Sequence, residues 1–248
     1  MIGYVIGIIQ PCLTARDLLK SCMDQADKPT KKWGWLQWGS VLGVTGLVGL
    51  ISMASWQLVK TAGEQAASIK NVRSIGGLFL AWAADNGGIF PDAIHYDERK
   101  TANLVFRQLF KDELLDDEKL FGAVRSPYKP DGEVGLAPYY AQAVGPNENH
   151  WMMFGEQSNA SPSNQVVLFE NSADASWPPW WHRGVEGPMR GRVWPGGKIA
   201  ICFTDCSVMM VTLVDKDGKL MLPESVLIPD PNPKFPRPLP SVLDIETR

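Results

Sequence analysis

The hydrophobic pattern of the chain is dominated by one uncharged apolar stretch, residues 33–59, which Lys31 and Lys32 precede and Lys60 follows. About 20 apolar residues in a helix suffice to cross a bilayer. Tryptophan is enriched where such helices leave the lipid, and this stretch carries tryptophans near both ends: Trp33, Trp35, Trp38 and Trp56. The pattern predicts a transmembrane helix over residues 33–59.

After the span, the pattern stays helical but becomes amphipathic. Apolar or small residues recur every three or four positions, which is the spacing of one helical face: Ala62, Ala66, Ile69, Val72, Ile75, Gly76, Phe79 and Ala83. The sequence Asp85-Asn86-Gly87-Gly88, followed by Pro91, is typical of a helix end, because glycine accepts the left-handed conformation of a C-terminal cap. We therefore predict that the helix continues over residues 60–85 and packs there on a domain.

The remaining pattern predicts one more helix and several short strands. The second helix is expected over residues 100–110, and a turn or short helix within the acidic segment 112–121. The strand candidates are residues 139–141, 150–154, 166–170, a hairpin of 198–203 with 208–214 that pairs Phe203 with Val208, and 219–222. The fold class is α+β: a long N-terminal transmembrane-plus-amphipathic helix packed on a small antiparallel sheet over about residues 166–222.

Charge and proline content divide the chain into segments. Lysine and arginine are more numerous before the span than in the equivalent stretch after it, which predicts a cytoplasmic segment 1–32 and a domain 60–222 on the other side. Residues 223–248 are proline-rich, so we expect a peripheral, extended tail without a central strand. Residues 1–13 are apolar but too short to span. They fit an interfacial segment, a docking strand or a misread start codon.

Candidate chemistry is sparse. The net charge of −3 comes with no basic stripe, so we expect no nucleic-acid partner. The three histidines stand in no catalytic or metal-binding motif, and we predict a protein that is not an enzyme. Two groups of residues could supply oxygen ligands to Ca²⁺: Asp85, Asn86 and Asp92, and Asp215 and Asp217. Both groups are also ordinary turn sequences. We therefore predict no cofactor and keep Ca²⁺ as the one candidate.

Three further groups of residues allow two interpretations each. Gly39, Gly43 and Gly46 are spaced so that helices could approach closely in lipid, or they reflect the ordinary glycine content of membrane helices. The aromatic loop with Trp177, Trp180 and Trp181 is either a contact surface or a loop folded over the sheet. Cys202 and Cys206 flank a tight turn, and the predicted register favours free thiols over a disulfide.

One segment carries a family resemblance. Residues 69–91 end in an aromatic residue, small residues, Asp-Asn, glycine and then proline: Trp82-Ala83-Ala84-Asp85-Asn86-Gly87-Gly88 and Pro91. This segment resembles the post-membrane helix of type II secretion pseudopilins and type IV pilin-like proteins of the planctomycete and verrucomicrobial type. Residues 166–170 and 196–208 resemble their C-terminal strands. The resemblance implies a single-pass inner-membrane protein with a periplasmic C-terminal domain and a structural role, whose partners are pilin-like subunits or secretion-system membrane components.

The chain also departs from that family. Gly34 and Trp35 resemble its processing site, but the fifth position counted from Trp35 is Gly39 and not the family's glutamate. Cys206 stands where the turn of the C-terminal hairpin usually has glycine. These differences leave an alternative: a membrane-tethered periplasmic binding module that keeps a pilin-like fold, does not form filaments and uses the tryptophan-rich loop for contact.

Overall fold

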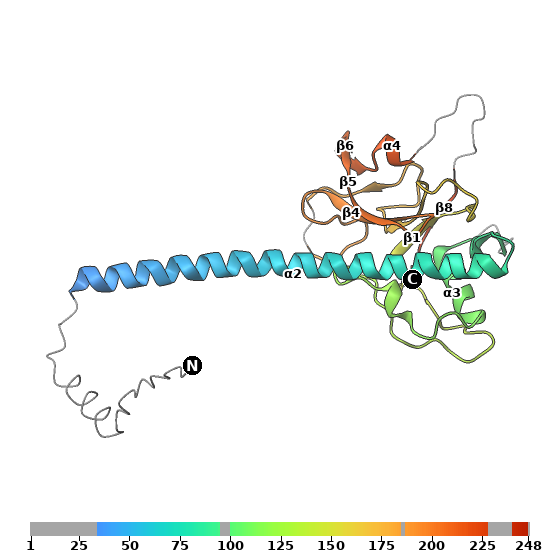
Figure 1. Ribbon diagram of the computed structural model, residues 1–248, viewed down its shortest axis with the longest axis horizontal. Helices are drawn as coiled ribbons and strands as arrows, with labels where there is room; N and C mark the ends of the chain where they lie inside the picture. Colours follow the sequence, from blue (N-terminus) through green and yellow to red (C-terminus); the bar gives the residue numbers. More distant parts are fainter. Residues whose placement is uncertain (1–33, 95–99, 185–186, 228–239, 248) are drawn as a thin grey trace, which may run out of the picture. The chain divides into compact units, whose positions relative to one another are not determined.

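The computed structural model describes residues 34–94, 100–184, 187–227 and 240–247 (Figure 1). It contains two units, Met1–Gln57 and Leu58–Arg248, and the boundary between them falls within helix α2 (Trp35–Asp85). In the first unit the described residues are Gly34 and the part of α2 up to Gln57. The cytoplasmic segment predicted over residues 1–32, including the apolar residues 1–13, lies outside the described residues.

The second part of α2 buries one face in the second unit. The buried residues follow the predicted helical spacing from residue 68 onward: Ser68, Val72, Ile75, Gly76, Phe79, Trp82 and Ala83. Ala62 and Ala66, which we expected on the same face, are exposed. The contacts described in these turns are polar ones, in which Arg125 pairs with Glu64 at 2.7 Å and donates to Thr61.

The predicted helix end is confirmed. Helix α2 stops at Asp85, and both Gly87 and Gly88 have positive φ, at 66° and 87°. The backbone N–H of Gly88 donates to the carbonyl of Ala83 at 2.8 Å, which satisfies a carbonyl of the last helical turn.

A five-stranded antiparallel sheet forms the centre of the second unit. Its strand order is β5-β4-β2-β1-β8, with β1 Trp151–Phe154, β2 Val166–Glu170, β4 Lys198–Phe203, β5 Val208–Thr212 and β8 Val242–Leu243. The strands predicted over 150–154, 166–170 and 198–203 are thereby confirmed, and the strand predicted over 208–214 ends at Thr212. The sheet is wider than the predicted range 166–222, because β1 and β8 lie outside it.

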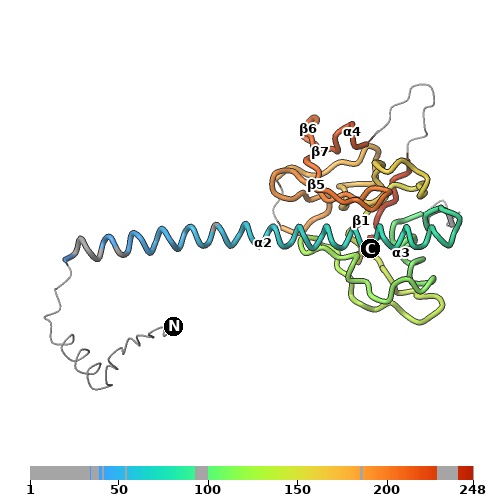
Figure 2. The backbone as a smooth tube through the Cα atoms, in the orientation of Figure 1, coloured from blue at the N-terminus to red at the C-terminus, as the bar shows by residue number. Residues whose placement is uncertain are grey.

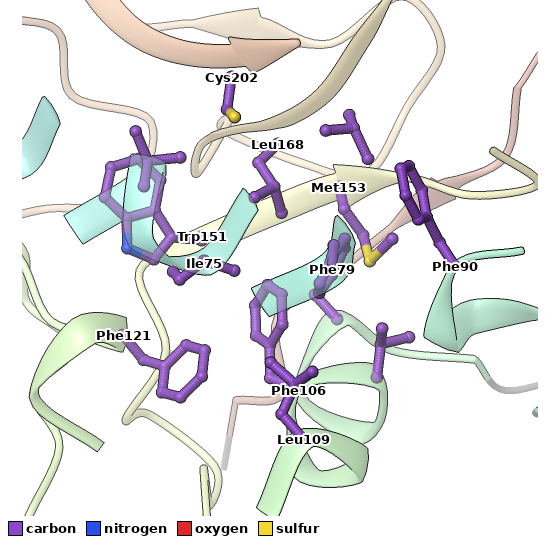
Figure 3. Packing of buried hydrophobic residues seen from close by; sticks show 14 of the residues in the cluster. Ile75, Phe79, Phe90, Phe106, Leu109, Phe121, Trp151, Met153, Leu168 and Cys202 are labelled. Atoms are coloured by element: carbon purple, nitrogen blue, oxygen red, sulfur yellow. The ribbon is translucent and has the colours of Figure 1, made fainter. Parts of the chain in front are cut away.

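Side chains alternate between the two faces of this sheet. Trp151 and Met153 of β1, Leu168 of β2 and Cys202 of β4 point to the face covered by α2 and α3 (Ala102–Lys111), as Figure 3 shows. Aromatic rings fill this layer, with Phe106 stacked on Phe121 at 4.8 Å between centroids. The helix expected at 100–110 is therefore α3, and its predicted apolar face is buried: Ala102, Val105, Phe106, Leu109 and Phe110.

A second, three-stranded sheet covers the opposite face. Its order is β3-β7-β6, from β3 Trp180–Trp181, β7 Lys219–Met221 and β6 Val214–Lys216. Met152, Phe169 and Ile201 of the large sheet pack with Trp181 and Leu220 of the small one. Figure 2 shows β6 and β7 on the side of β5 away from α2. The unit is thus a helix layer, a five-stranded sheet and a smaller sheet. Its remaining elements are short: η1 Pro91–Ile94, η2 Glu118–Phe121 and α4 Glu224–Leu227.

Two local predictions were wrong. Residues 139–141 form a turn and not a strand, and Tyr140 takes a positive φ of 44°. The β4–β5 register is shifted by one residue, so that Cys202 and not Phe203 pairs with Val208. The cause is a three-residue loop in which Cys206, at φ 63°, adopts the left-handed conformation and brings Phe203 opposite Ser207.

The end of the proline-rich tail is not peripheral. Strand β8 pairs with β1 as an edge strand, and Leu243 and Ile245 are buried. The segment also bonds to the start of α3: the N–H of Ala102 donates to Asp244 at 2.7 Å, and the hydroxyl of Thr101 to Glu246 at 2.6 Å. A short edge strand needs few backbone donors, so proline nearby does not prevent it.

Candidate functional site

The first unit presents an apolar helix whose described side chains are exposed. Leu42, Leu50 and Met53 are 69%, 69% and 70% exposed, although each is strongly hydrophobic. Among the described residues, one helix is long and apolar enough to cross a membrane, and the qualifying stretch begins at Leu42. The helical part of the predicted span at 33–59 therefore has the length, composition and exposure of a lipid-facing segment.

The glycines predicted for helix packing lie on this helix. A Cβ atom added at Gly39, Gly43 or Gly46 would meet nothing within 4 Å, so the space beside each glycine is open. A second helix could approach the backbone there as closely as small residues allow. Gly34 directly precedes the helix and Trp35 is its first residue, which puts the predicted processing site at the helix start.

The three tryptophans predicted as a contact surface separate in the structure. Trp181 is fully buried on the small sheet and its indole N–H donates to the carbonyl of Glu170. Trp177 is partly buried against Phe154, with 5.2 Å between ring centroids. Trp180 and Trp181 are neighbours in β3, so their side chains point to opposite faces of the strand, and Trp181 is the one that faces the core. Trp181 is a core residue, so of the two interpretations the structure supports packing over the sheet for Trp181 and excludes it from a contact surface.

Trp180 is the partly exposed member of the group. Its indole N–H donates to Asp174 at 2.9 Å, and the ammonium of Lys219 lies 4.5 Å from its ring centroid. The ring of His182 contacts it edge-on at 4.9 Å. A cation over one ring and a histidine at its edge fix the orientation of Trp180 at the surface.

A cleft of about 470 Å³ lies beside the small sheet. Five apolar side chains and three glycines line it, and two arginines and one aspartate supply charge: Arg183, Gly184, Arg192, Val193, Trp194, Pro195, Gly196, Gly197, Leu213, Asp215 and Leu220. Arg183 and Asp215 pair with each other at 2.8 Å. A cleft of this volume, with apolar and charged groups side by side, has room for a small ligand or a peptide side chain.

A smaller cavity of about 20 Å³ shares Arg192 and Trp194 with the cleft and adjoins His150 and Glu170. Asn171 accepts from the N–H of Gly191, so its amide nitrogen faces Nδ1 of His150, at 2.6 Å. The proton of a neutral His150 ring therefore lies on Nε2, which is 3.7 Å from Glu170.

Glu170 is already engaged, since both of its oxygens accept from the indole N–H of Trp194, at 2.8 and 2.9 Å. The adjoining cavity has room for about one water molecule and none for a substrate. We interpret this histidine–glutamate pair as structural.

Three carboxylates gather in the loops beside α3. Oxygens of Glu118, Asp131 and Glu148 lie within 4.8 Å of one another. Burial raises the pKa of Glu118 and of Glu148, and the neighbouring charge of Asp131 acts in the same direction. Backbone N–H groups oppose the rise, with Gly132 and Val144 donating to Glu118. Hard oxygen ligands at this spacing are the type that could hold Ca²⁺ or Mg²⁺.

The oxygen ligands predicted from sequence do not form this cluster. Asn86 donates to the carbonyl of Trp82, as a helix-end residue does. Asp92 is buried, accepts from the N–H of Glu156 at 2.5 Å, and has a pKa raised by its burial. Asp215 accepts from Gly218 in the predicted turn at residues 215–218 and pairs with Arg183. The acidic cluster escaped sequence reasoning because its members come from the start of η2 and two separate loop positions, without a motif.

The two described cysteines are free thiols, as predicted. Cys202 is buried in the core, and Cys206 is partly buried in the turn. Their sulfurs both lie beside Gly76 of α2. This contact was not predicted from the sequence.

Comparisons with known proteins do not place the chain in a family. No family model matches the chain, and neither a curated protein nor a solved structure does.

Proposed function

We propose that the protein is a pilin-like structural subunit of a type II secretion or type IV pilus-like system. The first part of α2 anchors it in the inner membrane as a single span, and the second unit lies in the periplasm. Its action is non-enzymatic: subunits associate through the membrane helix and present the folded unit to one another or to a secreted cargo.

One observation carries the proposal. A single helix begins with exposed apolar side chains and then becomes the buried helix of an α+β unit with an antiparallel sheet. A helix that is hydrophobic all round is stable in lipid, whereas the amphipathic part needs the sheet to cover its apolar face. The excess of lysine and arginine before the span supports the orientation.

The glycines of the span support association between subunits. The chain has Gly39 at the position where the pilin-like family that it resembles has a glutamate, so an ion pair with a neighbouring subunit is not available there. Association would then depend on close backbone approach at Gly39, Gly43 and Gly46, where the structure leaves open space.

The test is self-association of the full chain in lipid vesicles, measured by energy transfer between labelled copies. Gly43→Leu fills the open space and should weaken association, since small residues are what let two helix backbones approach closely in lipid. Gly63→Leu is the matched control, because Gly63 is also open and helical but lies beyond the span. Equal association of wild type and Gly43→Leu would contradict the assembly proposal.

The alternative is a membrane-tethered binding module that does not assemble, and the cleft beside Trp194 favours it. The cleft replaces the tryptophan loop as the contact site of this alternative, because Trp181 is buried. Wild-type protein that stays monomeric in vesicles at high surface density would make this second function the better supported one.

A further inference from the structure

Two thiols and one glycine meet where the β4–β5 turn covers helix α2. A Cβ atom added at Gly76 would lie 2.7 Å from Sγ of Cys202 and 3.2 Å from Sγ of Cys206. Both distances are shorter than a normal van der Waals contact, so the two sulfurs occupy the space that any side chain at position 76 would need. Gly76 thereby allows the thiols to lie together against the helix.

The turn brings the second thiol to this place. The N–H of Cys206 donates to the carbonyl of Phe203, and the N–H of Phe203 donates to Ser207, each at 2.9 Å. Cys206 is the left-handed residue of this three-residue loop, a position that usually favours glycine. Because Cys206 carries a side chain at this position, its sulfur lies beside Gly76, where Sγ of Cys202 also lies.

The two thiols differ in their chemistry. The side-chain interaction between Cys202 and Cys206 raises the pKa of Cys202, and burial raises it further. The same interaction lowers the pKa of Cys206 although its partial burial acts in the opposite direction. Cys206 is thus the thiol that more readily forms a thiolate, and it is also the one that solvent reaches. This asymmetry suits a pair in which the accessible thiol attacks a disulfide and the buried thiol resolves the product.

We propose that Cys206 and Cys202 form a thiol–disulfide exchange site whose co-reactant is a disulfide, on a small molecule or on another protein. The Cys206 thiolate attacks one sulfur of the co-reactant, which forms a mixed disulfide and releases one thiolate. Cys202 then attacks Sγ of Cys206 and gives its proton to the second leaving thiolate. The protein gains one disulfide and loses two hydrogens, and the co-reactant is reduced to two thiols.

The site is independent of subunit assembly, since all three residues belong to the second unit. An oxidised pair would link the β4–β5 turn to strand β4 directly over α2. Disulfides persist in oxidising compartments such as the periplasm, where the second unit is proposed to lie.

The experiment uses the full chain in detergent micelles, with oxidised glutathione as the co-reactant. Cys12→Ser and Cys22→Ser remove the other two thiols of the sequence. After blocking of free thiols, trypsin releases residues 199–216 as one peptide that holds both Cys202 and Cys206. Mass spectrometry should find this peptide lighter by two hydrogens, with no glutathione attached. A peptide that keeps both thiols under these conditions would overturn the proposal.

Two single variants assign the roles. Cys202→Ala should accumulate a stable glutathione adduct on Cys206, because the resolving thiol is absent. Cys206→Ser should react roughly tenfold more slowly, because the remaining thiol is buried and its burial raises its pKa. Near-UV circular dichroism checks that each core stays packed. Equal adduct formation on both variants, or an adduct that persists in the two-thiol protein, would refute the assigned order of attack.

Discussion

The two parts of helix α2 have similar apolar residues but different surroundings. Ile51 in the first part is 58% exposed, whereas Ile75 in the second part is fully buried. Gly43 has open space around it, and Gly76 is in contact with two sulfurs. Helical periodicity is common to both parts, so the difference comes from what covers them. A sheet and a second helix cover one face of the second part, and lipid is the solvent that suits the first.

The largest effect that separates the two parts is expected from Ile75→Ala. It removes methyl and methylene groups from a closed core and should lower the free energy of unfolding by about 2–5 kcal/mol. Ile51→Ala makes the same change on the same helix and should stay within about 0.5 kcal/mol. Denaturant unfolding of the full chain in micelles, followed by tryptophan fluorescence, measures both. Similar losses for the two variants would break the comparison.

An introduced charge should affect the first part of α2 more than the second. Val48→Arg places a cation in the proposed span, where it costs roughly 2.5–3.5 kcal/mol at a membrane centre, and we expect it to reduce the membrane-bound fraction. Ala67→Arg introduces the same charge at an exposed position of the second part and should leave that fraction unchanged. Alkaline extraction of membranes gives the measurement. Full retention of Val48→Arg would argue against a lipid-facing first part.

Adjacent glycines allow the finest comparison. Gly76→Ala brings a Cβ against two sulfurs and should destabilise the protein by about 1–3 kcal/mol, even though alanine favours helix. Gly77→Ala meets nothing within 4 Å and should stabilise it by up to about 1 kcal/mol. Thermal unfolding of each variant, alone and combined with Cys202→Ala, completes a double-mutant cycle. The loss of stability caused by Gly76→Ala should be smaller when Cys202→Ala removes the nearer sulfur. An unchanged loss would mean that the clash is not with Cys202.

Local sequence patterns predicted the elements of the fold better than their pairing. The end of α2, helix α3 and strands β2, β4 and β5 follow from periodicity and glycine, which are local signals. The register of the hairpin depends on one left-handed cysteine, which sequence reasoning treated as a poor replacement for glycine. The strand predicted at 219–222 is confirmed as β7, but its two partners in the second sheet escaped prediction, because β3 has two residues and β6 is exposed along its whole length. Neither strand carries enough apolar alternation to reveal a partner.

The candidate sites were harder to predict because they depend on contacts between distant residues. Glu118, Asp131 and Glu148 approach one another only through folded loops. The tryptophan loop contained a usable signal, since adjacent strand residues face opposite ways and one of Trp180 and Trp181 had to point inward. Which of the two is buried depends on β7, which follows much later in the sequence.

Strand β8 has a consequence for the order in which the protein is made and folded. The bond between Thr101 and Glu246 joins residues 145 positions apart, and β1 lacks a neighbour on one side until β8 arrives. Loop closure over such distances is slow, and an unpaired edge strand invites aggregation. A nascent chain therefore carries an unfinished sheet until residues 242–246 have been synthesised. During that interval, the unpaired edge of β1 could be covered by a chaperone that binds extended segments.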